Sequence, residues 1–253
     1  MKVKVNTKVR DKVMKSLTGE RFTSRTFSVT KLTCCPRKTF YSMSGVRAVI
    51  SEASTLFMAR GRGLHYELQK GFKDTEVRKE MDVIRGDIDA VDERITEMYS
   101  TNMSLSKVVD ETKVPSVFPA KIKQLMAYCF MSGVNTGDLL VFFMSGDYSR
   151  FTDIFGEKVY TGIQPEIRVW TLEFTEEELK ENWKKILDNK AEIELALKTG
   201  NPPLVCGEEF ECKNCGFNYT CLGEEEEFEC KNCGFNYTCL GEEPVTEPVE
   251  ELK

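Results

Sequence analysis

Two acidic side chains within residues 84–100 are the strongest candidates for chemistry in the sequence. β-branched residues alternate with other types on both sides of the polar segment Asp92–Arg94, which predicts two short strands joined by a turn. This hairpin places Asp89 on the first strand and Glu97 on the second. Carboxylates that converge from adjacent strands can share one divalent cation, because Mg²⁺ and Mn²⁺ prefer oxygen ligands. The alternative is a solvated acidic hairpin without a site.

The only histidine of the chain, His65, is a candidate third ligand of such a cation. Apolar residues recur at helical spacing through residues 45–72, so a long helix is predicted there, and His65 lies in its second half. A neutral imidazole is a good ligand for a metal that two carboxylates already hold. A lone histidine on a helix is also compatible with a structural role.

A second predicted helix carries three polar side chains on one face. It extends from Pro119 to Gly133, and Lys121, Gln124 and Tyr128 follow one another at i, i+3 and i+7. One interpretation is a polar stripe at the surface. The other is a row that faces the metal site, in which the amide and the phenol hold DNA.

The cysteines indicate a metal or cluster site rather than disulfides. No segment has the roughly 20 apolar residues that cross a bilayer, and the N-terminus lacks the apolar core of a signal peptide, so the sequence predicts a cytoplasmic protein without membrane contact. Thiols stay reduced in that compartment. Ten cysteines there therefore favour metal or cluster ligation.

Three of these cysteines form a closely spaced group near the C-terminus. Cys212, Cys215 and Cys221 follow the pattern Cys-x2-Cys-x5-Cys within residues 208–225, and this whole segment recurs unchanged as residues 226–243. A perfect repeat of this kind indicates a recent duplication rather than a repeat that builds a fold. One triplet supplies three thiolates, whereas a tetrahedral or cubane centre needs four.

Two sets of four ligands are compatible with these cysteines. A zinc ribbon would use Cys212, Cys215, Cys230 and Cys233. An iron–sulfur cluster would combine one triplet with a distant cysteine, for which Cys35 is the candidate. The chain before the duplication had a single triplet, so we favour the cluster. Cys206 is a possible substitute ligand, and Cys129 fits a place in the core.

The charge is unevenly distributed along the 253 residues, with a net value of −6. Residues 1–40 contain eleven Lys and Arg against two acids, and Glu predominates from Glu208 onward. A basic N-terminal face is compatible with DNA binding. The chain is divided into a basic N-terminal segment, a main domain, a cysteine segment, its duplicate and an acidic disordered tail: residues 1–27, 28–205, 206–225, 226–243 and 244–253.

The remaining pattern predicts an α/β domain with a mixed central sheet flanked by helices. A strand is expected around Val77, a buried central strand over 137–145 and an alternating strand over 165–174. Thr175 and the glutamates after it form a capping box, which predicts a helix that ends at Gly200. Residues 101–117 are polar and are expected to form a loop.

Taken in order, these motifs resemble the CRISPR-associated RecB-like exonucleases, which are iron–sulfur members of the PD-(D/E)XK nuclease superfamily. The resemblance covers about residues 28–225. It rests on a Thr-x-Leu-x-x-Cys-Pro-Arg start, a Gly-x-x-x-His helix segment, Gly-x-x-Asp, Gln-x-x-x-Tyr, a Val-Trp-x-Leu-x-Phe strand and the closing triplet, at Thr30–Arg37, Gly61–His65, Gly86–Asp89, Gln124–Tyr128, Val169–Phe174 and Cys212–Cys221.

The resemblance implies a metal-dependent deoxyribonuclease that acts on single-stranded DNA ends in CRISPR spacer acquisition or in viral DNA metabolism. It assigns the catalytic Mg²⁺ or Mn²⁺ to His65, Asp89 and Glu97, and DNA positioning to Gln124 and Tyr128. It assigns a [4Fe–4S] cluster that joins the N- and C-terminal segments to Cys35, Cys212, Cys215 and Cys221. It also implies CRISPR adaptation proteins as partners, and oligomers are compatible with it.

One position departs from the pattern of this family. The third catalytic element is Glu-x-Lys in the family, and here it is Glu97-Met98-Tyr99. The ammonium of that lysine orients the attacking water and stabilises charge on the phosphate, which a neutral tyrosine does not. Lys121 is best placed by spacing to replace it. The alternatives are a nuclease-like protein that binds DNA or a partner protein without cutting, and a zinc-ribbon DNA-binding protein.

Overall fold

The computed structural model describes residues 7–18, 26–108, 110–144, 165–204, 212 and 215–222, with only the backbone of 151–152, 158–159 and 222. The statements below concern these residues. Cys206, the duplicate at 226–243 and the acidic tail after residue 243 lie outside them. In the part of the chain that is described, no helix is both long and apolar enough to cross a membrane.

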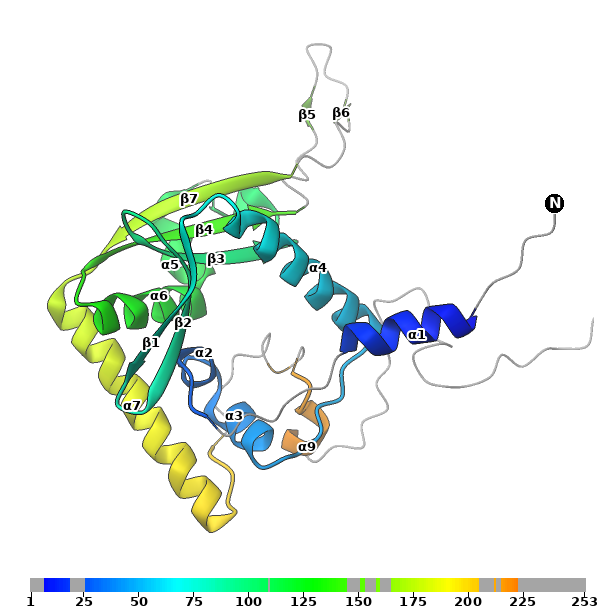
Figure 1. Cartoon of the computed structure of the whole chain (residues 1–253), viewed down its shortest axis with the longest axis vertical. Coiled ribbons are helices and arrows are strands. Elements are labelled where there is room, and N and C mark those ends of the chain that lie inside the picture. Colours follow the sequence, from blue (N-terminus) through cyan, green and yellow to red (C-terminus); the bar gives the residue numbers. More distant parts are fainter. Residues whose placement is uncertain are drawn as a thin grey trace, which may run out of the picture.

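The described elements form runs of helices and runs of strands along the chain (Figure 1). The helices are α1 Thr7–Thr18, α2 Val29–Leu32, α3 Pro36–Met43, α4 Glu52–Gln69, α5 Val114–Val117, α6 Pro119–Ser132, α7 Glu176–Thr199 and α9 Asn218–Leu222. The strands are β1 Asp74–Met81, β2 Ile84–Val91, β3 Ile95–Thr101, β4 Thr136–Phe143, β5 Phe151–Thr152, β6 Lys158–Val159 and β7 Glu166–Glu173. Two 3₁₀ turns lie at Leu105–Val108 and Glu111–Lys113.

The predicted mixed sheet is confirmed. Five strands pair in the order β1-β2-β3-β4-β7, and only the β3–β4 pair is parallel. A parallel pair needs a crossover, and the chain between these two strands contains α6, which packs on both of them. The predicted strand over 137–145 is β4, which lies between β3 and β7 with most of its side chains buried.

Helix α6 lies between the sheet and α7, and two glycines let it approach the strands closely. A Cβ atom at Gly86 would lie 3.0 Å from Cε1 of Tyr128, and one at Gly137 would lie 2.8 Å from Cδ1 of Leu125. A larger residue at either position would push α6 away from the sheet. Glycine in the Gly-x-x-Asp motif therefore serves the packing of the helix that carries Lys121.

The predicted helix over 45–72 begins later than expected. Ser51 caps α4 by accepting a hydrogen bond from the amide of Ser54, and residues 46–51 are not helical. The amide of Val49 donates instead to the carbonyl of Gly216 at 2.7 Å, so this segment lies against the cysteine tail. Only the C-terminal end of α4 covers the sheet, where Leu68 packs with Ala90, Met98 and Leu140.

Other differences are local. Residues 101–117 were expected to be a loop but contain the two 3₁₀ turns and α5, and the basic N-terminal segment contains the helix α1. The capping box at Thr175 is confirmed, because Thr175 accepts from the Glu178 amide while Glu178 accepts from the Thr175 amide. Helix α7 ends at Gly200 in the left-handed conformation, as predicted.

Candidate active site

The sheet is interrupted on both sides of Asp89. The β2–β3 ladder pairs Val91 with Ile95 and Ala90 with Thr96 and goes no further, and on the other side the β1–β2 register omits Glu76 and Asp89. The hydrogen-bond acceptors of Asp89 therefore find partners outside these two ladders. Its Oδ2 accepts a hydrogen bond from the amide of Met98 at 2.8 Å, and its carbonyl accepts from Nε2 of Gln69 at 3.2 Å. The Asp89 carboxylate is anchored where strands β2 and β3 separate.

Glu97 follows on β3 and is completely buried. Its Oε1 accepts a hydrogen bond from Nζ of Lys121 at 2.7 Å, whereas its Oε2 has no hydrogen-bond partner. Burial raises the pKa of Glu97 to about 8; the ammonium of Lys121 opposes this shift and the Asp89 carboxyl adds to it. A buried carboxylate with a free oxygen is costly unless a proton or a cation neutralises it.

Lys121 brings an ammonium to the place where the Glu-x-Lys pattern lacks one. Alternation along β3 places Glu97 and Tyr99 on the face covered by α6, and Nζ of Lys121 lies 5.5 Å from the centre of the Tyr99 ring. Burial works against the charged form, but the Glu97 carboxylate outweighs it, so the pKa of Lys121 is raised. The side chain is 24% exposed, which leaves the ammonium within reach of a ligand.

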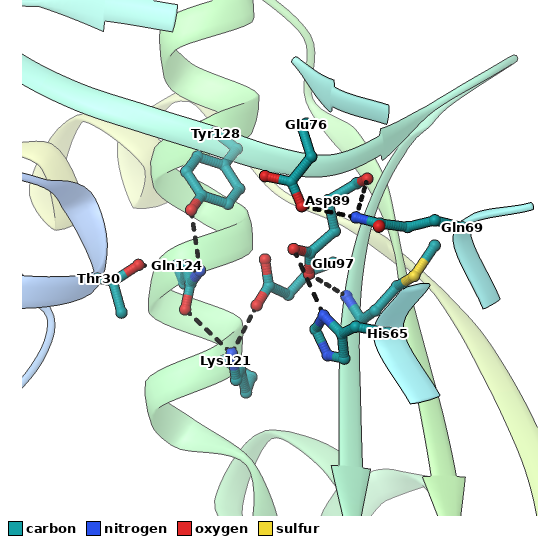
Figure 2. A network of polar contacts seen from close by, with 10 residues as sticks. Thr30, His65, Gln69, Glu76, Asp89, Glu97, Lys121, Gln124 and Tyr128 are labelled. Carbon is teal, nitrogen blue, oxygen red and sulfur yellow. Dashed lines mark hydrogen bonds and ion pairs between the residues drawn. The ribbon is translucent and has the colours of Figure 1, made fainter. Parts of the chain in front are cut away.

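Gln124 and Tyr128 continue from Lys121 along α6, and Gln124 lies between the other two side chains (Figure 2). Oε1 of Gln124 accepts from Lys121 at 3.3 Å, and Nε2 of Gln124 donates to the Tyr128 hydroxyl at 2.8 Å and to the Thr30 hydroxyl at 3.4 Å. Gln124 and Tyr128 are both buried, and burial raises the pKa of Tyr128, so the phenol stays neutral. Their contact with DNA stays a prediction. The structure shows Gln124 in contact with Lys121, and Tyr128 in contact with Gln124.

His65 faces the same carboxylate from α4. Its Nδ1 lies 3.8 Å from Oδ1 of Asp89, and the two side chains are 30% and 16% exposed. This separation is longer than a hydrogen bond but short enough for both groups to face one small ion. His65 of α4 is thus brought to the same place as Asp89 and Glu97 of the β2–β3 hairpin (Figure 2).

Within the described ranges, no group of three or more His, Cys, Asp or Glu side chains is arranged closely enough to hold a metal ion as it stands. The donor set nevertheless suits Mg²⁺ or Mn²⁺: the carboxyls of Asp89 and Glu97 lie within electrostatic reach of each other, and the unpartnered Oε2 of Glu97 leaves room for a cation in place of a proton. The role of His65, Asp89 and Glu97 as metal ligands stays a prediction.

Two residues of this region, Gln69 and Glu76, were not predicted from the sequence. Nε2 of Gln69, at the end of α4, donates to Oε1 of Glu76 at 2.8 Å as well as to the Asp89 carbonyl. Glu76 follows Thr75 at the start of β1 and adopts a positive φ of 52°. No motif marks either residue, because their proximity to Asp89 depends on the β1–β2 register.

The four predicted cluster cysteines lie in one region, although as they stand they are not close enough to hold a metal ion. Cys35 precedes α3, Cys212 and Cys215 precede α9, and Cys221 lies within it. Burial raises the pKa of Cys221; Arg37 opposes this, and the thiols of Cys35, Cys212 and Cys215 add to it, so all four lie within electrostatic reach. The Tyr41 hydroxyl donates to the Thr220 carbonyl at 3.3 Å, which joins the same two chain ends.

The identity of the group that these thiols bind stays a prediction. The [4Fe–4S] assignment to Cys35, Cys212, Cys215 and Cys221 is compatible with their convergence. The zinc-ribbon alternative needs Cys230 and Cys233, which lie outside the described residues.

The raised pKa of Glu97 predicts an unusual pH dependence of stability when cations are removed. In the unfolded chain this carboxyl loses its proton near its ordinary pKa of 4.5, whereas in the folded protein it keeps the proton up to a pKa of about 8. The folded state then binds more protons than the unfolded state between these values, so stability falls as the pH rises through this window. Thermal unfolding in EDTA from pH 5 to 8.5 measures this slope.

The matched control for this measurement is Glu97→Gln, whose amide has no proton to lose at these pH values. We expect a flatter dependence of the melting temperature on pH for this variant. Saturating Mn²⁺ should flatten the wild-type dependence as well, because the cation replaces the proton. A wild-type slope in EDTA equal to that of Glu97→Gln would contradict the buried, proton-holding carboxyl.

Comparison with known proteins finds similarity to several solved structures. No protein-family model matches it, and no curated protein matches it in sequence. A solved structure of SSO0001 is similar over 87% of this chain and 98% of its own, at 16% identity and a TM-score of 0.48.

An alkaline exonuclease from Laribacter hongkongensis, LHK-Exo, is similar over 73% of this chain and 95% of its own, at 13% identity and a TM-score of 0.43. The same exonuclease in complex with dAMP is similar over 71% and 94%, at 14% identity and a TM-score of 0.42. At such identities and TM-scores, the function of this chain has to be argued from its own site.

Proposed function

We propose that the protein is a metal-dependent deoxyribonuclease that hydrolyses phosphodiester bonds, with single-stranded DNA ends as its substrate. One observation carries the proposal: the buried Glu97–Lys121 ion pair, which leaves Oε2 of Glu97 free beside the Asp89 carboxylate. A cation bound at these carboxylates would then lie beside the ammonium of Lys121. This pairing favours phosphodiester hydrolysis, because the phosphate and the two carboxylates are anionic.

His65, Asp89 and Glu97 would hold the cation. When bound, Mg²⁺ or Mn²⁺ polarises the phosphate and lowers the pKa of a coordinated water. The hydrogen bond from the Met98 amide fixes the Asp89 carboxylate toward the cation, and the three donors come from α4, β2 and β3. These elements pack together only in the folded domain, so the site is assembled by the fold.

Lys121 would act on the substrate side of this site. Its ammonium is held by Glu97 and Gln124, and it orients the attacking water and stabilises the charge that develops on the scissile phosphate. The raised pKa of Lys121 keeps it protonated at neutral pH. Gln124 and Tyr128 would position this ammonium and the DNA next to it. A part in CRISPR spacer acquisition or in viral DNA metabolism belongs to the same proposal.

The variant Asp89→Asn tests the site directly. The amide oxygen still accepts the hydrogen bond from the Met98 amide, so the fold is retained while one ligand charge is lost. We expect Mn²⁺-dependent degradation of single-stranded DNA to fall below detection. Asp87→Asn is the matched control, because Asp87 lies on the same strand and binds Arg78 and Arg85 instead. Equal activity of Asp89→Asn and the wild type would rule this site out.

A second candidate function is DNA or partner binding without cutting. Tyr99 in place of the usual lysine favours it, whereas the ion pair between Lys121 and Glu97 favours the nuclease. The variant Tyr99→Lys separates the two. Cutting by Tyr99→Lys but not by the wild-type holo-protein would establish the binding protein and refute the nuclease.

A further inference from the structure

A third acidic residue, Glu76, lies next to Asp89 in the row that contains Asp89 and Glu97. On β1, Thr75 pairs with Ala90 and Val77 pairs with Ile88, so the register places Glu76 opposite Asp89. On β3, the register that pairs Ala90 with Thr96 places Glu97 opposite Asp89 as well. Three carboxylates on three neighbouring strands thus meet at the point where the sheet is interrupted (Figure 2).

Such a row is unfavourable without a counter-charge, because like charges on directly opposed strand residues destabilise a sheet. Glu76 moreover adopts a positive φ of 52°, which glycine or asparagine would adopt at lower cost. Backbone strain of this kind persists where the surrounding structure enforces it and is concentrated at functional sites. The free, fully buried Oε2 of Glu97 independently indicates that a positive ligand belongs beside this row.

Gln69 holds the Glu76 carboxylate in place. Its Nε2 donates both to Oε1 of Glu76 at 2.8 Å and to the carbonyl of Asp89 at 3.2 Å, so one amide ties the exposed acid to the backbone of the proposed ligand. An exposed glutamate without such a bond would keep its rotamer freedom in solvent. Here Gln69 holds the side chain beside Asp89 (Figure 2).

We propose that Glu76 is an additional carboxylate of the cation site, which Gln69 holds toward the water ligands of a Mg²⁺ or Mn²⁺ ion bound at Asp89 and Glu97. This inference rests on the proposed function and names a residue that would strengthen cation binding. Mg²⁺ keeps several of its waters in proteins, and carboxylates that accept hydrogen bonds from them orient the ion. Glu76 is thus a positioning residue for the cation.

Titration of the full-length protein with Mn²⁺ alone, in the absence of DNA, tests this role by calorimetry or by the electron paramagnetic resonance of free Mn²⁺. Glu76→Gln should weaken Mn²⁺ binding by about tenfold, the size of effect that supporting ligands have on metal affinity. Gln69→Ala should weaken it less, because the carboxylate remains but is no longer held. Glu80→Gln, the same change on the same strand outside the row, should leave the affinity unchanged.

Glu76→Gly separates a functional role from a structural one. Glycine removes the carboxylate and relieves the positive φ, so this variant should melt in EDTA no lower than the wild type while it binds Mn²⁺ more weakly. A residue that only stabilised the fold would show the opposite: a lower melting temperature and an unchanged affinity. That result, or an unchanged affinity in Glu76→Gln, would overturn the role of Glu76.

Asp89→Asn distinguishes this failure from a failure of the proposed function. Loss of Mn²⁺ binding in Asp89→Asn with wild-type binding in Glu76→Gln would refute the role of Glu76 alone. Absence of Mn²⁺ binding in the wild-type protein would refute both the cation site and the role of Glu76.

Discussion

Replacing Lys121 by methionine is expected to lower the rate of single-stranded DNA cleavage by roughly 10²–10³-fold, the effect of removing one preorganised donor from a developing negative charge. Methionine keeps most of the volume of the side chain and removes only its charge and donors. The Glu97 carboxyl loses its partner and is then neutralised by a proton or a cation rather than left charged, so the fold is retained. Single-turnover cleavage with saturating Mn²⁺ measures the effect.

Two further variants show whether the loss is due to this ammonium. Lys123→Met removes the same charge from an exposed position of the same helix and should cleave like the wild type. The double variant with Lys121→Met and Tyr99→Lys should regain part of the lost rate, since residue 99 lies on the same face of β3 as Glu97 and next to the Lys121 ammonium. Full activity of Lys121→Met would show that another group stabilises the phosphate.

Replacing Cys35 by serine is expected to remove the proposed iron–sulfur cluster and to lower the melting temperature on the order of 10 °C. A link between Cys35 and the tail cysteines closes a loop of about 180 residues, and loops of this length give the largest entropic stabilisation. A loss of a few kcal/mol corresponds to this shift in a protein of this size. Iron content, visible absorbance and thermal unfolding of anaerobically purified protein give the three measurements.

Cys34→Ser is the matched control, because Cys34 is adjacent to Cys35 in the chain but is not one of the four predicted cluster ligands. This variant should keep its iron and its colour. A colourless wild-type protein that contains zinc and no iron would reject the cluster and favour the zinc ribbon of Cys212, Cys215, Cys230 and Cys233. Unchanged iron in Cys35→Ser would reject Cys35 as a ligand.

Local patterns were sufficient to predict several parts of this structure. The turn at Asp92–Arg94 sets the register of the β2–β3 hairpin, and this register alone brings Asp89 opposite Glu97. Helical spacing alone places Lys121, Gln124 and Tyr128 on one face of α6. Both depend on residues less than ten positions apart, where the geometry of a strand or a helix leaves few alternatives.

The long-range contacts were decided only by the tertiary structure. Sequence spacing named Lys121 as a candidate, but its distance to Glu97 depends on how α6 packs across β2 and β3, which the small Gly86 permits. The helix predicted from residue 45 begins only at Glu52, because residues before it pair with the tail at Gly216. Helical periodicity does not report such a partner more than 160 positions away in the chain.

Among the residues of the site, Glu76 was the hardest to predict from the sequence. It depends on the β1–β2 turn, where Asp82 and Val83 adopt positive φ values of 51° and 61° although neither is glycine. In a sequence, such turns are usually marked by Asn-Gly or Asp-Gly. Here Trp183 of α7 instead holds the turn by donating a hydrogen bond to Asp82 at 2.9 Å. The sequence by itself thus determined which residues could bind a cation, while contacts between distant segments decided which of them meet, because a turn without glycine needs a partner from elsewhere in the fold.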